Sequence, residues 1–424
     1  MRTSFVASLL FVSVSVTGQI KFGDYFTDKV LRCDFMFSGN SRETKVYPMG
    51  MKEEPFWAGS RINLTDPFKY GNFIYEVFDD TTNVLIYSRG FSSLYQEWQT
   101  TAEAKTISRS FYEVVTMPFP KNKIRLVIIG RKRDGAFNTY YETKIDPADY
   151  FIRKEPPLNV QSAEIKRGGD PTKSVDVAFI AEGYTADEMD KFHEDVKKMS
   201  DSLFSEEPFA DYEKRFNIWA VDAVSQESGT DVPGEGIYVN TALNSSFYTF
   251  NIDRYVTTQD IKSVNDYAAV VPHDVIIILV NSSRYGGGGV YNYYSGTTAG
   301  HELSQKVFMH EFGHGFAGLA DEYYTSEVAY EEFYPLDTEP WEPNITTMVD
   351  FGSKWKKHIA KRTPVPTPAE EEFKNVTGVF EGGGYSEKGI FRPEMDCRMK
   401  SNEAKGFCSV CRNAIKVMIG FYTK

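Results

Sequence analysis

Histidine and cysteine are scarce in this chain, which has six histidines and four cysteines among its 424 residues. Basic stripes are also missing: the formal net charge is −12, whereas binding to nucleic-acid phosphates needs clustered lysine and arginine. Beyond the N-terminus, no apolar run approaches the roughly 20 residues of a membrane-crossing helix. We therefore expect neither a nucleic-acid partner nor a membrane-spanning segment.

The longest apolar run lies at the N-terminus. Arg2 supplies a positive charge, residues 4–16 are apolar or small, and Thr17 and Gly18 give a small-residue exit. This order is typical of a secretory signal peptide over residues 1–18. We expect an exported protein that is secreted, periplasmic or held at the cell surface.

Residues 19–151 have the pattern of a β-sandwich. Short runs rich in Val, Ile, Phe and Tyr alternate with polar residues and are separated by turn signals. The predicted strands are Leu31–Phe37, Asn72–Phe78, Asn83–Ser88, Arg109–Thr116 and Ile124–Ile129. Repeated short strands without helical periodicity predict a sandwich. No catalytic constellation stands out there, so we expect a structural or binding role.

A second domain is predicted over residues 152–424, after a proline-containing linker. Its expected elements are the strands Val175–Ile180, Phe216–Val221 and Val275–Val280 and the helix Ala186–Phe204. This β-α-β order predicts a mainly parallel sheet packed by helices, with Thr185 as the helix cap. The mostly irregular segment Ser225–Tyr267 is of a kind that is often functional. The fold class is therefore α+β.

A run of four glycines, Gly286–Gly289, follows the last of these strands. No Lys-Ser/Thr pair comes after it, which argues against a phosphate-binding loop. The run is either a mobile surface loop or part of an edge strand that pairs with an extended peptide.

The strongest functional signal is the pentapeptide His310-Glu311-Phe312-Gly313-His314. On an α-helix, residues four apart lie on one face, so His310 and His314 can direct their rings at one metal ion. Zinc is the usual occupant of such a pair, and Glu311 is placed to act as a general base. Phenylalanines recur every four residues on another side, which predicts a buried central helix over Leu303–Ala317.

The third metal ligand has to come from beyond this helix. Asp321 would lie about 10 Å past His314 along a continued helix, too far for metal bonds of about 2 Å. The helix is therefore expected to end near Gly318, which suits a left-handed stop and lets the chain turn back. Glu322 is the alternative ligand, or it braces a ligand from behind. A further possibility places the ligand on a following helix, at Glu327, Glu331 or Glu332.

An exported protein can form disulfides. Cys408 and Cys411 could be half of a structural zinc site, but a second Cys-x-x-Cys pair is missing. A disulfide from Cys397 to Cys408 or Cys411 is favoured over three free buried thiols. Cys33 is expected to be a buried apolar residue.

The chain resembles the immunoglobulin-A-protease-like family of zinc metallopeptidases, which is a zincin family. The resemblance rests on Ala181–Thr185, on His310–Tyr323 (HEFGHGFAGLADEY), and on Cys397–Met399 followed by Phe407–Cys411. It implies a β-rich first domain and a zincin-type peptidase domain with a mixed sheet and a central active-site helix. Relative to the usual motif HExxHxxGxxH/D, Gly318 and Asp321 each come one residue late.

The resemblance also implies roles for individual residues. By this likeness, His310, His314 and Asp321 hold zinc, and Glu311 is the catalytic base. Met399 resembles the methionine that lies beneath the zinc in many zincins. Tyr385, which is flanked by glycines, and Tyr323 are candidates to hold the oxyanion of the transition state.

These features predict an exported zinc endopeptidase that acts on protein or glycoprotein substrates. Immunoglobulin A is suggested as a substrate by the family name alone. The alternative is a catalytically silent surface-binding protein that uses the sandwich domain to dock on a ligand. Glu311 argues against this alternative, because a dead site needs no base.

Overall fold

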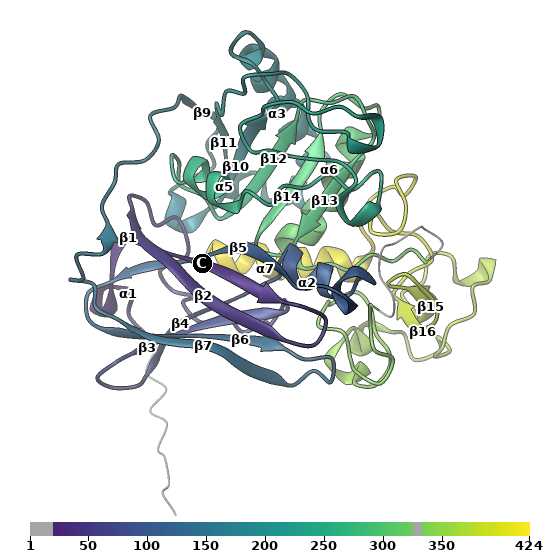
Figure 1. Ribbon diagram of the computed structural model, residues 1–424. Coiled ribbons are helices and arrows are strands. Elements are labelled where there is room, and N and C mark those ends of the chain that lie inside the picture. Colours follow the sequence, from purple (N-terminus) through teal and green to yellow (C-terminus); the bar gives the residue numbers. More distant parts are fainter. Residues whose placement is uncertain (1–19, 325–332) are drawn as a thin grey trace, which may run out of the picture.

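The computed structural model describes residues 20–324 and 333–424. A β-sandwich lies below a second, helix-covered sheet in Figure 1. The sandwich follows a short helix α1 (Phe22–Tyr25) and has two four-stranded sheets. In spatial order, the first sheet contains β5 (Arg109–Pro120), β1 (Phe26–Gly39), β2 (Thr44–Glu54) and β8 (Ile152–Arg153). The second contains β4 (Leu85–Phe91), β3 (Phe73–Asp79), β6 (Ile124–Arg131) and β7 (Phe137–Ile145).

Aromatic rings join the two sheets of the sandwich. Phe37 on β1 meets Phe73 on β3 with ring centroids 5.0 Å apart, and Phe35 meets Tyr141 on β7 at 5.3 Å. Such edge-on contacts are favourable beyond the area they bury. The predicted β-sandwich is therefore confirmed. The strands β2 and β7 and helix α2 (Leu94–Gln99) are additions to the prediction, and β8 extends the first sheet past residue 151.

The second domain has a six-stranded sheet in the order β13-β14-β12-β10-β11-β9. Its four inner strands are parallel, and both edge strands are antiparallel to their neighbours. The strands are β9 (Ser162–Lys166), β10 (Val175–Glu182), β11 (Phe216–Val221), β12 (Val275–Val280), β13 (Gly287–Val290) and β14 (Tyr294–Thr298). The mainly parallel sheet is thus as predicted.

Helices accompany this sheet, and a hairpin precedes the last of them in the chain. The helices are α3 (Met189–Leu203), α4 (Phe209–Tyr212), α5 (Ile261–Ala268), α6 (Ser304–Ala317) and α7 (Ser409–Tyr422). The hairpin pairs β15 (Phe380–Gly383) with β16 (Ser386–Arg392). Across 20–324 and 333–424, no helix combines the length and hydrophobicity that crossing a membrane requires.

The motif Ala181–Thr185 ties the long insertion to the sheet. The buried carboxylate of Glu182, at the end of β10, accepts hydrogen bonds from the Thr241 hydroxyl at 2.6 Å and from the backbone N–H of Ser245 at 2.7 Å. Bonds to an ionised acceptor are stronger than neutral ones. The motif is therefore a structural anchor, and Thr185, the predicted helix cap, forms a capping box with Glu188.

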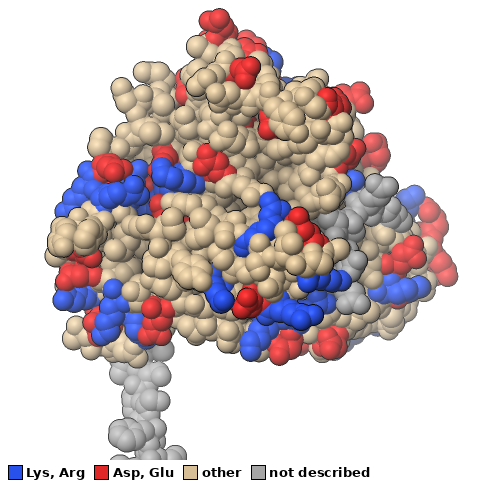
Figure 2. Space-filling view, viewed as in Figure 1, with Lys and Arg blue, Asp and Glu red and all other residues tan. Residues whose placement is uncertain are grey.

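Charged side chains on the face shown in Figure 2 are mixed in sign over the sandwich, without a continuous basic stripe. A buried ion cluster joins the two domains beneath the surface. Arg32 on β1 lies 2.6 Å from Asp34, 3.3 Å from Glu54 and 2.7 Å from Asp266 on α5. Burial opposes the charge of Arg32, but the carboxylates outweigh it and raise the pKa of the guanidinium above its ordinary value.

Replacing Arg32 with methionine is expected to lower the free energy of unfolding by about 3–5 kcal/mol, because buried carboxylates lose their partner. Urea unfolding followed by tryptophan fluorescence measures this loss. Lys29→Met on the same strand is the matched control, since Lys29 is 53% exposed and pairs with Glu53 at the surface. The control should lose less than about 1 kcal/mol. Equal losses in the two variants would contradict the role of the cluster.

Candidate metal centre

Helix α6 turns one side to the core and another to a cleft. Phe308, Phe312 and Phe316 are buried, and successive ring centroids lie 5.7 and 5.2 Å apart. His310 and His314 lie on the cleft side with 14% of each side chain exposed. The aromatic wall therefore fixes the helix so that both imidazoles face one space, as the spacing predicts.

The chain reverses directly after this helix. The helix ends at Ala317, and Gly318 adopts a left-handed φ of 63°, as predicted. Its N–H bonds to the carbonyl of His314 at 3.0 Å. A Cβ at this position would come within 2.8 Å of the Trp341 ring, so both the backbone and the packing favour glycine.

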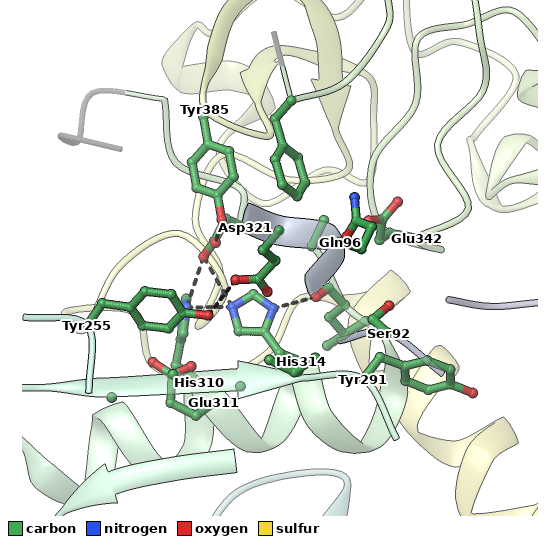
Figure 3. A pocket seen from close by; sticks show the side chains of 18 of the residues that line it. Ser92, Gln96, Tyr255, Tyr291, His310, Glu311, His314, Asp321, Glu342 and Tyr385 are labelled. Atoms are coloured by element: carbon green, nitrogen blue, oxygen red, sulfur yellow. Dashed lines mark hydrogen bonds and ion pairs between the residues drawn. The ribbon is translucent and has the colours of Figure 1, made fainter. Parts of the chain in front are cut away.

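The reversal brings Asp321 onto the histidine pair. Its Oδ1 lies 2.9 Å from His310 Nε2 and 3.3 Å from His314 Nε2, and the two Nε2 atoms are 3.0 Å apart. Figure 3 shows the carboxylate directed at both imidazole rings. Asp321, rather than Glu322, therefore completes the trio. The glutamates of the predicted following helix lie outside the described residues; they are Glu327, Glu331 and Glu332.

The hydrogen bonds on the far side of each ring select the tautomer that binds metal. His310 Nδ1 lies 3.0 Å from the carbonyl of Arg398, and His314 Nδ1 lies 2.6 Å from the carbonyl of Leu319. A carbonyl only accepts, so each Nδ1 carries a proton, and in the neutral imidazole each Nε2 presents a lone pair. The two Nε2 atoms and Asp321 Oδ1 then converge as three possible ligand atoms. This donor set fits a divalent cation such as zinc.

The charges within the trio are strongly coupled. Burial disfavours protonation of His314, but the Asp321 carboxylate outweighs this and raises the pKa of His314 to about 9. The pKa of His310 is raised in the same way. Burial likewise opposes ionisation of Asp321, yet the histidines hold its pKa well below the ordinary range. The pocket therefore stabilises the ionised carboxylate of Asp321 together with a positive charge beside it.

Glu311 is close to the trio without belonging to it. Its carboxylate lies beneath Gly287 of β13. A Cβ on Gly287 would come within 2.8 Å of Glu311 Oε1. Burial raises the pKa of this carboxyl. The side chain lines the same cavity as the three candidate ligands, which leaves it available to exchange a proton there.

The two candidate tyrosines both contact the trio. The Tyr385 hydroxyl donates to Asp321 Oδ2, and Tyr385 has a positive φ of 66°. The ring of Tyr323 stacks on His310 with centroids 6.3 Å apart. Tyr385 is thus placed to orient Asp321, and its suggested oxyanion role stays a prediction. Met399 packs against α6 at Gly313, between the two histidines. A Cβ on Gly313 would lie only 2.8 Å from the Met399 sulfur.

Glu322 points away from the histidine pair. Its Oε1 accepts from Asn344 Nδ2 at 2.9 Å and lies 3.2 Å from Cys411 Sγ. The disulfide expected for Cys397 is a wrong prediction: its sulfur lies 3.7 Å from that of Cys411, and the four cysteines are free. Cys33 is buried, as predicted.

The glycine run forms edge strand β13, and so the prediction of an edge strand is confirmed over that of a surface loop. The structural reason for the glycines is the helix behind the strand, because a Cβ on Gly289 would lie 2.4 Å from the Glu311 carbonyl oxygen. On its outer side, Gly287 bonds to Arg254 and Val256 of the long insertion. The strand is therefore pressed against α6 at the level of the site.

Sequence reasoning missed the residues that complete the cavity walls. Gln96 and Glu97 reach the cavity from α2 of the sandwich, and Arg254 and Tyr255 reach it from the insertion. The Tyr255 hydroxyl donates to Glu97 Oε2 at 2.6 Å and joins these two walls. The irregular composition of the insertion was the only sequence feature that pointed to a functional role for it. Nothing in the sandwich sequence indicated that this domain contributes residues to the site.

Gly289→Ala is expected to lower the free energy of unfolding by about 1–3 kcal/mol, because the new methyl group meets helix backbone that cannot move aside. Gly296→Ala, on the neighbouring strand β14, is the control. Its methyl group would first meet an atom at 3.4 Å, and the change should stay below about 1 kcal/mol. Thermal and urea unfolding of both variants measure the difference. Indistinguishable stabilities would show that β13 does not need its glycine.

Tyr385→Phe is expected to weaken metal affinity by about 10- to 100-fold, because Asp321 loses a hydrogen bond that orients it. Competition with a chromogenic chelator measures this affinity. Tyr285→Phe is the control, since that hydroxyl accepts a hydrogen bond from Asn402 rather than orienting Asp321. Unchanged affinity in Tyr385→Phe, with a fall in turnover alone, would favour the oxyanion role instead.

Comparison with known protein families agrees with this geometry. A family model described as IgA Peptidase M64 matches residues 163–376 and 369–419. A second model, described as Peptidase M64 N-terminus, matches residues 21–142. No curated protein matches the chain significantly. Together the two models cover both domains, and the chain belongs to the IgA peptidase M64 family of metallopeptidases.

Proposed function

We propose that this peptidase is an exported zinc endopeptidase. The observation that carries the proposal is the convergence of His310 Nε2, His314 Nε2 and Asp321 Oδ1, three ligand atoms that can share one cation. Three nitrogen and oxygen ligands with a remaining open position are the usual protein contribution to a catalytic zinc site. When bound, zinc supplies a Lewis acid that acidifies water and polarises a peptide carbonyl.

The residues beside the trio account for the movement of protons. Glu311 is an uncommitted carboxylate that can take the proton of the attacking water and deliver it to the leaving amine. Arg254 and Tyr323 line the adjoining cavity and can donate to the charge that develops on the carbonyl oxygen. Tyr385 holds Asp321 in place from behind. Each group thus has a separate task.

The shape of the cleft supports cleavage within a chain rather than at its end. Two cavities meet at His310 and Glu311. One extends toward Gln96 of the sandwich, and the other toward Tyr285 and residues 400–402. A peptide that occupies both has residues on each side of the bond to be cut. Strand β13 lies at the edge of the sheet, and beyond Gly287, which bonds to the insertion, it can offer backbone groups to an extended substrate.

Protein substrates follow from the peptidase family, and we propose that they include glycoproteins. Immunoglobulin A is a candidate because it appears in the description of the matching family model. Export rests on the sequence of residues 1–18, which has the order of a signal peptide.

Glu311→Gln is expected to keep the metal of the parent protein and to lower turnover by about 10²- to 10⁴-fold, because only the proton acceptor is lost. Metal per chain is measured by plasma mass spectrometry. Cleavage is measured on a panel of proteins that includes immunoglobulin A, and the cut sites are read by mass spectrometry.

His314→Ala is the matched comparison and should lose both the metal at this site and the cleavage. Cleavage by Glu311→Gln at the parental rate would refute the assigned base. A zinc-loaded parent that cuts no protein of the panel would favour a catalytically silent surface-binding protein.

A further inference from the structure

A second cluster of metal-ligating side chains lies behind Asp321. It consists of Glu322, Cys397, Cys408 and Cys411, all buried, with one ligand atom from each within 4.8 Å of all the others. Glu322 comes from the reversal after α6, Cys397 from the chain after β16, and the other two from the start of α7. Three separate segments thus meet at one point, and the histidine site uses none of these four side chains.

The distances in the cluster are those of ligands around a tetrahedral zinc ion. Atoms bound about 2.0–2.3 Å from such an ion lie about 3.3–3.8 Å from one another. The sulfurs of Cys397 and Cys411 are 3.7 Å apart. Glu322 Oε1 lies 3.2 Å from the sulfur of Cys411 and 3.9 Å from that of Cys408. A disulfide would need two sulfurs about 2.05 Å apart.

The cluster contains a buried acceptor that lacks a partner. Glu322 is fully buried, and its Oε2 has no hydrogen-bond partner in the described parts of the chain. Leaving a carboxylate oxygen in this state is costly unless a proton or a cation compensates it. A cation bound by the neighbouring sulfurs would provide that compensation.

Backbone donors reach two of the three sulfurs. The backbone N–H of Cys408 donates to Cys397 Sγ at 3.2 Å, and that of Cys411 donates to Cys408 Sγ at 3.4 Å. Cys408 caps the N-terminus of the 14-residue helix α7, where the helix dipole favours negative charge. Arg392 and Lys400 supply positive charge that acts on Glu322. Together with a divalent cation, these two side chains would balance the four negative charges of three thiolates and a carboxylate.

We propose that Glu322, Cys397, Cys408 and Cys411 bind one structural zinc ion, separate from the metal of the histidine site. The ion takes four protein ligands and so keeps no position for water, which is the mark of a structural site. Each of the three thiols releases its proton to solvent on binding. Sulfur-rich ligand sets of this kind select zinc over harder cations.

The position of this second site would allow it to stabilise the segment that carries Asp321. Glu322 follows Asp321 directly, and its backbone N–H bonds to the carbonyl of Met399 at 2.8 Å. An ion at the cluster joins the Asp321 segment to the chain around Met399 and to helix α7. It thereby holds the third ligand of the histidine site without touching substrate.

The test uses the full chain with His310→Ala and His314→Ala combined, so that the histidine site cannot hold its metal. We expect about one zinc per chain to remain after dialysis against a weak chelator. Adding Cys408→Ser should remove it, whereas adding Cys33→Ser, at a buried cysteine in the sandwich, should not. Replacement of the remaining zinc with cobalt(II) should produce a thiolate-to-cobalt charge-transfer band in the near ultraviolet.

Counting thiols in the same double-histidine variant covers the case in which Cys408→Ser fails to fold. After denaturation with a strong chelator, a zinc site leaves four reactive thiols. Two reactive thiols and no zinc would replace the proposal with a disulfide. Four thiols with no zinc would mean that the cluster binds nothing. Because the histidine ligands are absent throughout, none of these outcomes depends on whether the chain is a zinc peptidase.

Discussion

The reversal of the chain at Gly318 is the constraint on which the candidate sites depend. A helix that continued past Ala317 would carry Asp321 about 10 Å beyond His314, out of reach of a shared metal. The left-handed Gly318 ends α6 at Ala317, and the following residues turn back toward the helix. Asp321 then faces the two histidines, while Glu322 faces the three cysteines. Two adjacent acidic residues thus face two different clusters from one irregular segment.

Close packing around helix α6 gives the site its rigidity. Strand β13 approaches the helix so tightly that Gly289 has no room for a side chain. Arg398 and Leu319 accept from the outer nitrogens of the histidines and so set the direction of both rings. The sandwich then closes one side of the cleft through α2. The first domain is therefore part of the cavity wall rather than a detached appendage.

The most predictable features were those with a strong local signal. The inner strands are continuous apolar runs, and α6 combines an aromatic period with the histidine pair, so both could be placed from sequence. Strand β2 escaped prediction because Tyr47 and Met49 face solvent and Pro48 interrupts the pattern. The role of Glu322 was also hidden, because its cysteine partners lie far away in sequence and form only one Cys-x-x-Cys pair. Such contacts arise from tertiary packing and leave no local pattern.

The central claim is that one cation is held jointly by His310, His314 and Asp321. Anomalous diffraction at the zinc absorption edge, from crystals of the protein purified without chelator, tests it most directly. The account predicts an anomalous peak within about 2.3 Å of both Nε2 atoms and of Asp321 Oδ1, with Glu311 outside bonding distance. A zinc-replete crystal without a peak among these three residues, or with Glu311 as a ligand, would contradict it.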